Sequence, residues 1–144
     1  MYSIDMKGKN GIVFGVANHR SIAWTIAQSL NQAGARLAIV YQNERLREGV
    51  AKLAESLDDP MMMECDATKD DQIEAAFDAA ASEMHTLNFV IHSIAFANRE
   101  DLGGSFSATS REGFQVAMEI SAYSLVPIAK HAAALMGDGG SIVT

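Results

Sequence analysis

The stretch GIVFGVANHRSIAWTIAQSLNQAGARLAIVYQ, residues Gly11 to Gln42, decides the fold. It contains a short apolar run, a turn, a segment with apolar residues at helical spacing and a second apolar run. This order predicts a strand–helix–strand unit of the kind that binds dinucleotides. The turn departs from the usual glycine pattern, because no glycine follows Gly15 until Gly34. The stretch is therefore either a nucleotide site of another design or an ordinary unit with Ser21 at the helix start.

Composition limits what the chain can be. Its 144 residues correspond to about one domain, and 49% of them are hydrophobic, enough for a substantial core. A net charge of −7 argues against a nucleic-acid partner, because binding phosphates requires a basic face. The single cysteine, Cys65, excludes an internal disulfide and fits a reducing compartment.

Nothing in the sequence predicts a membrane partner. No apolar run approaches the ~20 residues that a membrane span needs. The first residues, MYSIDMK, lack the basic-then-apolar order of a signal peptide. We therefore expect a soluble, cytoplasmic protein that does not bind membranes.

Apolar runs and helical repeats alternate along the whole chain. The expected strands are residues 12–14, 37–41, 61–65, 87–94 and 141–144. Expected helices cover residues 21–33, 46–57 and 68–84 and a long stretch after residue 109. Buried strands joined by helical crossovers predict one domain, residues 1–144, with a doubly wound parallel sheet of the Rossmann type.

The long helical stretch carries two local signals. It opens with Thr109, Ser110, Arg111 and Glu112, which match a capping box. Pro127 lies inside the stretch and predicts either a kink or two helices in series.

Parallel sheets bind ligands beyond the carboxyl ends of their strands, so the residues that follow each strand are the candidate site. Gly15 can form a tight turn, and Ser21 can present a hydroxyl to a diphosphate at a helix start. Gln42 can bond ribose hydroxyls, and Asp66 can accept from an adenine amino group. The alternatives are a capping serine, an exposed polar residue and a helix-capping aspartate, respectively.

Metal and nucleophile chemistry find little support. The four histidines have no metal-ligand spacing with cysteine or carboxylate clusters. His92 lies on an apolar strand and is expected to be a hydrogen-bonded core histidine. Cys65 has no companion histidine arrangement, so we do not expect it to act as a nucleophile.

Several stretches together resemble the NADH-dependent enoyl-acyl carrier protein reductases of bacterial fatty-acid synthesis, a divergent branch of the short-chain dehydrogenases/reductases. The stretches are GVANHRSIAWTIA, YQNERL, CDAT, HSIAFANREDLGG and TSREGFQVAMEISAYSLVPIAKHA. The resemblance runs from about Lys7 to Thr144. In this family the diphosphate turn reads glycine, five residues, then Ser-Ile-Ala, which accounts for the glycines missing after Gly15.

The resemblance implies a site for NADH. By it, Gly15, Ser21 and Ile22 line the phosphates, and Gln42 meets the adenosine ribose. The remaining implied cofactor residues are Asp66 and Ala67 at the adenine, and Ser93, Ile94 and Ile120 at the nicotinamide side. Ala97 is implied at the acyl-substrate pocket.

The resemblance also implies an activity and partners. The family transfers a hydride from NADH to carbon 3 of a trans-2,3 enoyl thioester on acyl carrier protein, and the resulting enolate is protonated. Family members assemble as tetramers. We expect NADH to be preferred over NADPH, because the neutral Gln42 offers no salt bridge to a 2′-phosphate. Arg45 and Arg47 lie close enough in sequence to counter this preference.

The family's catalytic tyrosine and lysine follow the fifth strand, beyond Thr144, and Tyr123 precedes that strand and cannot take the role. We therefore expect the chain to be the cofactor-binding half, whether truncated, cleaved or part of a longer polypeptide. We expect it to be inactive alone and to self-associate. Two alternatives are a non-catalytic nucleotide-sensing module of the same ancestry and a 3-ketoacyl carrier-protein reductase, whose glycine-rich turn and Asn-Asn-Ala-Gly strand end are absent.

Overall fold

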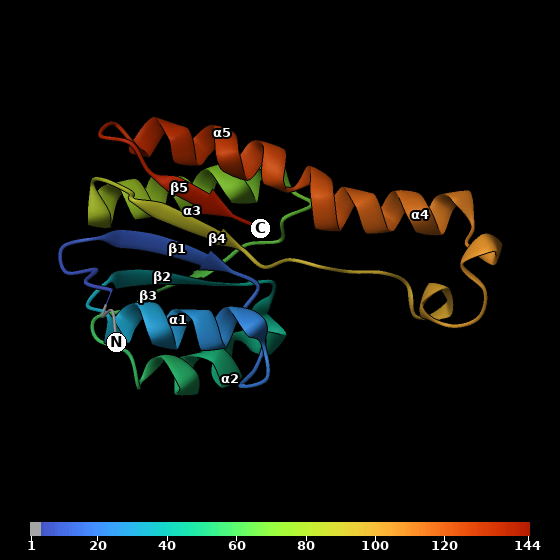
Figure 1. Cartoon of the computed structure of the whole chain (residues 1–144), viewed down its shortest axis with the longest axis horizontal. Helices are drawn as coiled ribbons and strands as arrows, with labels where there is room; N and C mark the ends of the chain where they lie inside the picture. Colours follow the sequence, from blue (N-terminus) through green and yellow to red (C-terminus); the bar gives the residue numbers. More distant parts are fainter. Residues whose placement is uncertain (1–3) are drawn as a thin grey trace.

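The computed structural model describes residues 4–144 and contains one parallel sheet between two layers of helices (Figure 1). Its strands are β1 (Asn10–Phe14), β2 (Arg36–Tyr41), β3 (Met61–Glu64), β4 (Phe89–His92) and β5 (Ser141–Val143). Their order across the sheet is β3-β2-β1-β4-β5, and every neighbouring pair is parallel. This confirms the predicted doubly wound sheet of the Rossmann type.

The helices divide between the two faces of the sheet. Figure 1 shows α1 (Ile22–Gln32) and α2 (Glu44–Ala54) on one face, and α3 (Asp70–Met84) and α5 (Leu125–Leu135) on the other. The chain moves from β1 toward β2 on one side and returns to β4 on the other. Parallel sheets of this order have a crevice at the carboxyl ends of the two strands where the direction changes, here β1 and β4.

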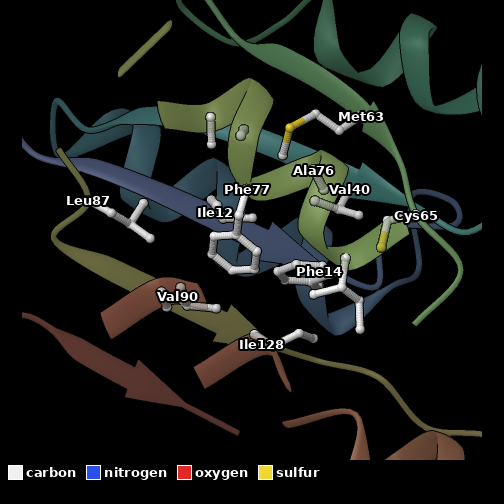
Figure 2. Packing of buried hydrophobic residues seen from close by; sticks show 14 of the residues in the cluster. Ile12, Phe14, Val40, Met63, Cys65, Ala76, Phe77, Leu87, Val90 and Ile128 are labelled. Carbon is white, nitrogen blue, oxygen red and sulfur yellow. The ribbon is translucent and has the colours of Figure 1, made fainter. Parts of the chain in front are cut away.

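Alternate residues of the central strands enter two separate cores. Val13, Leu37 and Ile39 face α1 and α2 and pack with the buried Trp24. Ile12 and its neighbours on the opposite face pack against α3 and α5. Figure 2 shows this second core, in which the ring centroids of Phe14 and Phe77 are 6.1 Å apart. Both faces of the sheet are thus covered, as its continuous apolar strands require.

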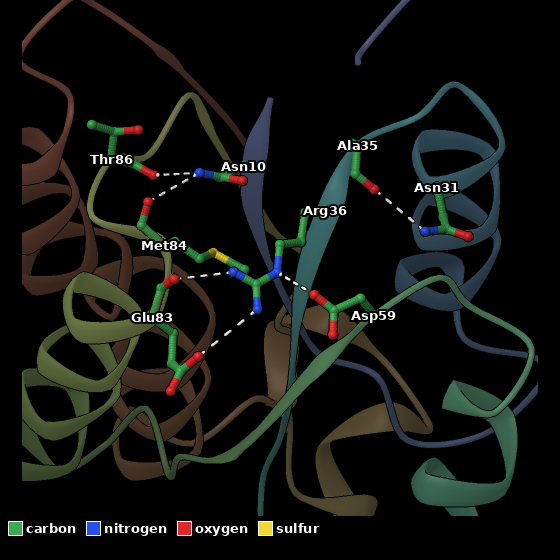
Figure 3. A network of polar contacts seen from close by, with 8 residues as sticks. All are labelled: Asn10, Asn31, Ala35, Arg36, Asp59, Glu83, Met84 and Thr86. Carbon is green, nitrogen blue, oxygen red and sulfur yellow. Dashed lines mark hydrogen bonds and ion pairs between the residues drawn. The ribbon is translucent and has the colours of Figure 1, made fainter. Parts of the chain in front are cut away.

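Polar side chains tie the elements together at the amino edge of the sheet, opposite the crevice (Figure 3). Arg36 Nη1 donates to the Glu83 carbonyl oxygen at 3.0 Å, and Arg36 Nε lies 2.9 Å from Asp59 Oδ2. The Nε contact is an ion pair without hydrogen-bond geometry. Asn10 Nδ2 donates to the carbonyl oxygens of Met84 and Thr86 at 3.2 and 3.1 Å. These contacts connect β1 and β2 to the end of α3.

Several predicted boundaries differ from those in the structure. The helix expected over residues 46–57, for example, spans Glu44–Ala54. The strand expected over residues 87–94 is shorter in the structure, and it pairs with β1 only over Phe89–His92. Leu87 is buried like a strand residue, but it does not pair with a residue of β1. The helix expected from Thr68 begins at Asp70, because Thr68 bonds back to Asp66 instead. Apolar residues extend past both ends of this strand, so periodicity alone cannot give its limits.

The capping box prediction was wrong by one residue. Ser110 is the N-cap of α4 (Arg111–Met118), and its Oγ accepts from the Gly113 amide at 2.9 Å. Before α4 the chain forms two short 3₁₀ turns, η1 (Arg99–Leu102) and η2 (Phe106–Ala108), which were not predicted.

Pro127 was expected to mark a kink or two helices in series, and two helices are present. A π-helical turn, η3 (Glu119–Tyr123), separates α4 from α5, and Pro127 lies in the first turn of α5. Proline is tolerated there, because its missing N–H has no partner to lose at a helix start.

Two glycines provide a stability test. An added Cβ at Gly11 in β1 would overlap the buried Phe89 ring, whereas one at Gly49 in α2 would meet nothing within 4 Å. We expect Gly11→Ala to lower the free energy of unfolding by about 1–3 kcal/mol through overpacking. The matched control Gly49→Ala should raise it by about 0.5–1 kcal/mol. Urea unfolding measures both, and equal effects would contradict the packing described for β1 and β4.

Candidate functional site

A cavity of about 170 Å³, open to solvent, lies at the carboxyl ends of the central strands. The predicted site residues that line it are Gly15, Gln42, Asp66, Ala67, Ser93, Ile94 and Ile120. Ser21, Ile22 and Ala97 are not among its lining residues. Residues that are far apart in sequence thus meet at the crevice that the strand order creates.

Gly15 sits where the ends of β1 and β4 meet. Its φ is +98°, and a Cβ there would overlap the Ser93 carbonyl oxygen. Its amide donates to the Val40 carbonyl oxygen of β2 at 3.3 Å. Two features therefore require glycine at this position: the backbone conformation and the close contact with the segment after β4.

Ser21 precedes α1, but its side chain does not cap the helix. Its Oγ instead accepts from the amides of Ala17 and Asn18, both at 3.0 Å. Ser21 is thus the N-cap residue of α1 by position, but its hydroxyl makes no capping bond. With both bonds accepted, the hydroxyl hydrogen remains available to donate to an anion. Ile22 begins the helix with its side chain 74% exposed.

The ends of β2 and β3 form one side of the cavity. Gln42 is exposed, whereas Asp66 is half-buried. Asp66 Oδ1 accepts from the Thr68 amide at 3.0 Å and from its hydroxyl at 2.8 Å, and the Asp66 amide donates to Gln72 Oε1 at 2.8 Å. The N-cap of α3 is Lys69, so Asp66 is not that helix's capping residue. Its carboxylate is held by a local turn that faces the cavity.

The segment after β4 forms the other side. Ser93 and Ile94 are half-buried, and the Ser93 amide donates to the Phe14 carbonyl oxygen at 3.3 Å. Ile120, from the π-helical turn, also lines the cavity. Ala97 lies further along this segment, outside the lining.

His92 is the hydrogen-bonded core histidine that the sequence predicted. It is 3% exposed, with Nδ1 2.9 Å from Thr144 Oγ1 and Nε2 2.8 Å from Ser124 Oγ. Ser124 donates its hydroxyl hydrogen to the Ile120 carbonyl oxygen at 2.7 Å, so its Oγ must accept from a protonated His92 Nε2. Burial lowers the pKa of His92, which favours this neutral form.

Cys65 lines the cavity but is not a reactive thiol. Burial, with smaller contributions from the carboxylates of Asp66 and Asp71, raises the pKa of Cys65 to about 12. Within residues 4–144, no cluster of three or more histidine, cysteine or carboxylate side chains could hold a metal ion. Across the same residues, no helix combines the length and apolarity needed to cross a membrane.

Sequence reasoning missed part of the lining. Leu46 and Phe96 contribute to it. Ser121 also went unnoticed, although its Oγ lies 3.0 Å from the Phe96 amide nitrogen. The sequence predicts Leu46 only as the first residue of the helix expected over residues 46–57. The one available signal for Ser121 was a pair of serines, Ser121 and Ser124, spaced by three inside an otherwise apolar helical stretch.

The family match and the similar proteins all point to one protein family. Residues 15–144 match the family described as Enoyl-(Acyl carrier protein) reductase. The chain is 47% identical to the enoyl-[acyl-carrier-protein] reductase [NADH] FabI of Bacillus cereus, over 96% of this chain and 55% of that protein. It is 43% identical to the enoyl-[acyl-carrier-protein] reductase [NADPH] FabI of Staphylococcus aureus, over 97% of this chain and 56% of that protein.

A solved structure agrees with the sequence matches. The Bacillus cereus enoyl-acyl carrier protein reductase, crystallised with NADP+ and indole naphthyridinone, superposes with a TM-score of 0.91 at 46% identity. The superposition covers 96% of this chain and 55% of that one. The chain therefore spans about half the length of the relatives it matches.

His92 gives a pH-dependent prediction. Its pKa lies below the ordinary 6.5 in the folded protein, so the unfolded chain takes up the proton first as the pH falls. This contribution to stability is complete above pH 6.5 and is lost as the pH falls through the folded pKa, by at most about 1.4 kcal/mol per pH unit. Unfolding in urea from pH 8 to pH 5 should show a shallower acid loss for His92→Gln. Equal slopes for the two proteins would contradict a neutral buried imidazole.

Proposed function

Because the chain belongs to the enoyl-(acyl carrier protein) reductase family, we propose that it supplies the dinucleotide site of an enzyme that reduces enoyl thioesters. The thioester would be a trans-2,3 enoyl group on acyl carrier protein, and the cofactor would be NADH. One observation carries the proposal. The residues that follow β1, β2, β3 and β4 line one cavity at the crevice where such sheets bind ligands.

The first turn has the chemistry that a diphosphate needs. Gly15 forms the tight turn with a φ of +98°, and the Ser21 hydroxyl has a hydrogen to donate. The first amides of α1 point out of the helix without helical partners, and the helix dipole favours an anion there. Ser21 and Ile22 lie outside the cavity lining, so their contact to phosphate remains a proposal.

The two sides of the cavity suit the two ends of a dinucleotide. Gln42 would bond the adenosine ribose, and Asp66 and Ala67 would flank the adenine. Ser93, Ile94 and Ile120 would border the nicotinamide riboside, and Ala97 would lie toward the acyl chain. When bound, NADH supplies the hydride for the double bond. The chain's own residues would bind the cofactor, orient it and exclude water on the apolar side.

Self-association is part of the proposal. Large apolar side chains are exposed from the end of η1 to the start of α5: Leu102, Phe106, Phe114, Met118, Tyr123 and Val126. Figure 1 shows α4 extending beyond the end of the sheet. An apolar surface of this kind supports assembly with further copies, as in a homotetramer.

Cofactor preference can be tested at Gln42. Its neutral side chain offers no salt bridge to a 2′-phosphate, and Arg47 lies 3.4 Å from Glu44 in an exposed ion pair. We expect NADH to bind at least about tenfold more tightly than NADPH, which corresponds to about 1.4 kcal/mol. Gln42→Arg should reduce or reverse this ratio, as measured by calorimetric titration.

Arg45 is the control for that experiment, because its charged side chain is exposed in the first turn of α2, two residues before Arg47. Arg45→Ala should leave the NADH affinity unchanged. If the unmodified chain bound NADPH more tightly than NADH, and Arg45→Ala removed the excess, the preference assigned to Gln42 would be wrong.

Enoyl reduction can be tested in a chimera that continues residues 1–144 with the matching remainder of the Bacillus cereus relative. With a crotonyl thioester, we expect it to oxidise NADH. Gly15→Ala in this chimera should slow turnover by on the order of a hundredfold, because the added methyl group would displace the backbone at Ser93, on one side of the cavity. Gly103→Ala, at a site where an added Cβ meets nothing within 4 Å, is the control. A folded chimera that binds NADH without reducing the thioester would contradict the proposed reaction.

A further inference from the structure

Two serines connect the helical layer to the end of β4 and to the segment that follows it: Ser121, within the π-helical turn η3, and Ser124, the residue directly after that turn. Ser121 Oγ accepts from the Phe96 amide at 3.0 Å and donates to the Phe96 carbonyl oxygen at 3.2 Å. Ser124 Oγ links His92 Nε2, at 2.8 Å, to the Ile120 carbonyl oxygen, at 2.7 Å. The first contact spans 25 residues of sequence and the second spans 32. We call these two contacts the serine clamps.

The serine clamps lie at the two ends of one wall of the cavity. His92 is the last residue of β4, and Phe96 comes four residues later; the residues between them, with Phe96 itself and Ile120, line the cavity. Residues 93–98 form neither helix nor strand. The Ser93 amide makes the last ladder-type bond, to Phe14. Beyond Ser93, the backbone of this wall is therefore held to the rest of the protein by Ser121.

The opposite wall has its own support. Asp66 is fixed by Thr68 and Gln72, which belong to the β3–α3 connection and to α3. None of these contacts involves η3. A change at Ser121 can therefore move one wall of the cavity without moving the other.

We propose that Ser121 is a positioning residue for the nicotinamide riboside end of the site, with Ser124 holding Ile120 on the same side. The proposal rests on the proposed dinucleotide site. Ser121 need not contact the cofactor. It fixes the backbone at Phe96, and so the place of Ser93 and Ile94, which would border the nicotinamide riboside.

The proposal distinguishes two ligands. NADH would contact both walls. ADP lacks the nicotinamide riboside, so it would contact only the turn after β1 and the wall that contains Gln42 and Asp66, which we call the adenosine wall. Removing the Ser121 hydroxyl should weaken NADH binding by about fivefold to tenfold, in keeping with the loss of one or two neutral hydrogen bonds. ADP affinity should remain within about twofold. A serine with a purely structural role would affect both ligands alike.

Calorimetric titration of the 144-residue chain with NADH and with ADP tests this. The variants are Ser121→Ala, Ser121→Cys and Ser121→Thr, with Ser29→Ala as the matched control. Ser29 is an exposed helical serine on α1 whose hydroxyl donates to the Thr25 carbonyl oxygen of its own helix at 3.0 Å. Ser121→Thr retains the hydroxyl and should bind NADH like the unmodified chain, and Ser29→Ala should do the same. Ser121→Cys, which keeps the size of serine but bonds weakly, repeats the test if the alanine variant fails to fold.

The outcomes separate the two proposals. If the unmodified chain binds neither NADH nor ADP, the proposed dinucleotide site is wrong, and the role of Ser121 falls with it. If the chain binds both, and Ser121→Ala or Ser121→Cys weakens both equally or neither, the role of Ser121 is wrong while the dinucleotide site stands. A selective loss of NADH affinity that Ser121→Thr restores supports the positioning role.

Discussion

The close contact between Gly15 and the Ser93 carbonyl oxygen is the constraint on which the site depends. No side chain fits between these two backbone segments, and the φ of +98° at Gly15 also favours glycine. Because β1 and β4 are the strands at which the connections change side, this contact holds together the two halves of the crevice. The other glycines of the common fingerprint are not needed here. Ser21 holds the turn instead, by accepting from the amides of Ala17 and Asn18.

The fold could be predicted from local patterns because its central strands are short apolar runs whose alternate residues enter two cores. Alternation of such runs with helical repeats has few solutions, and it predicts an α/β fold with a parallel sheet. Element ends were less predictable. Thr109 and Ser110 both suit an N-cap, and the bond from the Gly113 amide to Ser110 decides between them only in three dimensions. Leu87 is buried like a strand residue but has no partner in the ladder.

The site was predictable where it depends on strand ends and hidden where it depends on the helical layer. Gly15, Gln42, Asp66 and Ser93 follow strands, so topology alone brings them to one edge. Ser121 lies in a stretch that reads as continuous helix, and its partner Phe96 is 25 residues away. The π-helical turn itself has no local sequence signature. The bond of Ser121 to Phe96 and that of the following Ser124 to His92 are tertiary contacts, and π-helical turns are frequent at functional sites.

The division of the cavity also bears on how the family varies. The Bacillus cereus relative is named for NADH and the Staphylococcus aureus relative for NADPH, at 47% and 43% identity to this chain. In the proposed orientation, the 2′-phosphate that distinguishes these cofactors would lie by Gln42, on the wall supported by β2, β3 and α3. Hydride transfer would take place at the other wall, which is held by η3. Because no hydrogen bond of η3 reaches Gln42 or Asp66 within residues 4–144, substitutions at the adenosine wall can change the cofactor while leaving the reacting end in place.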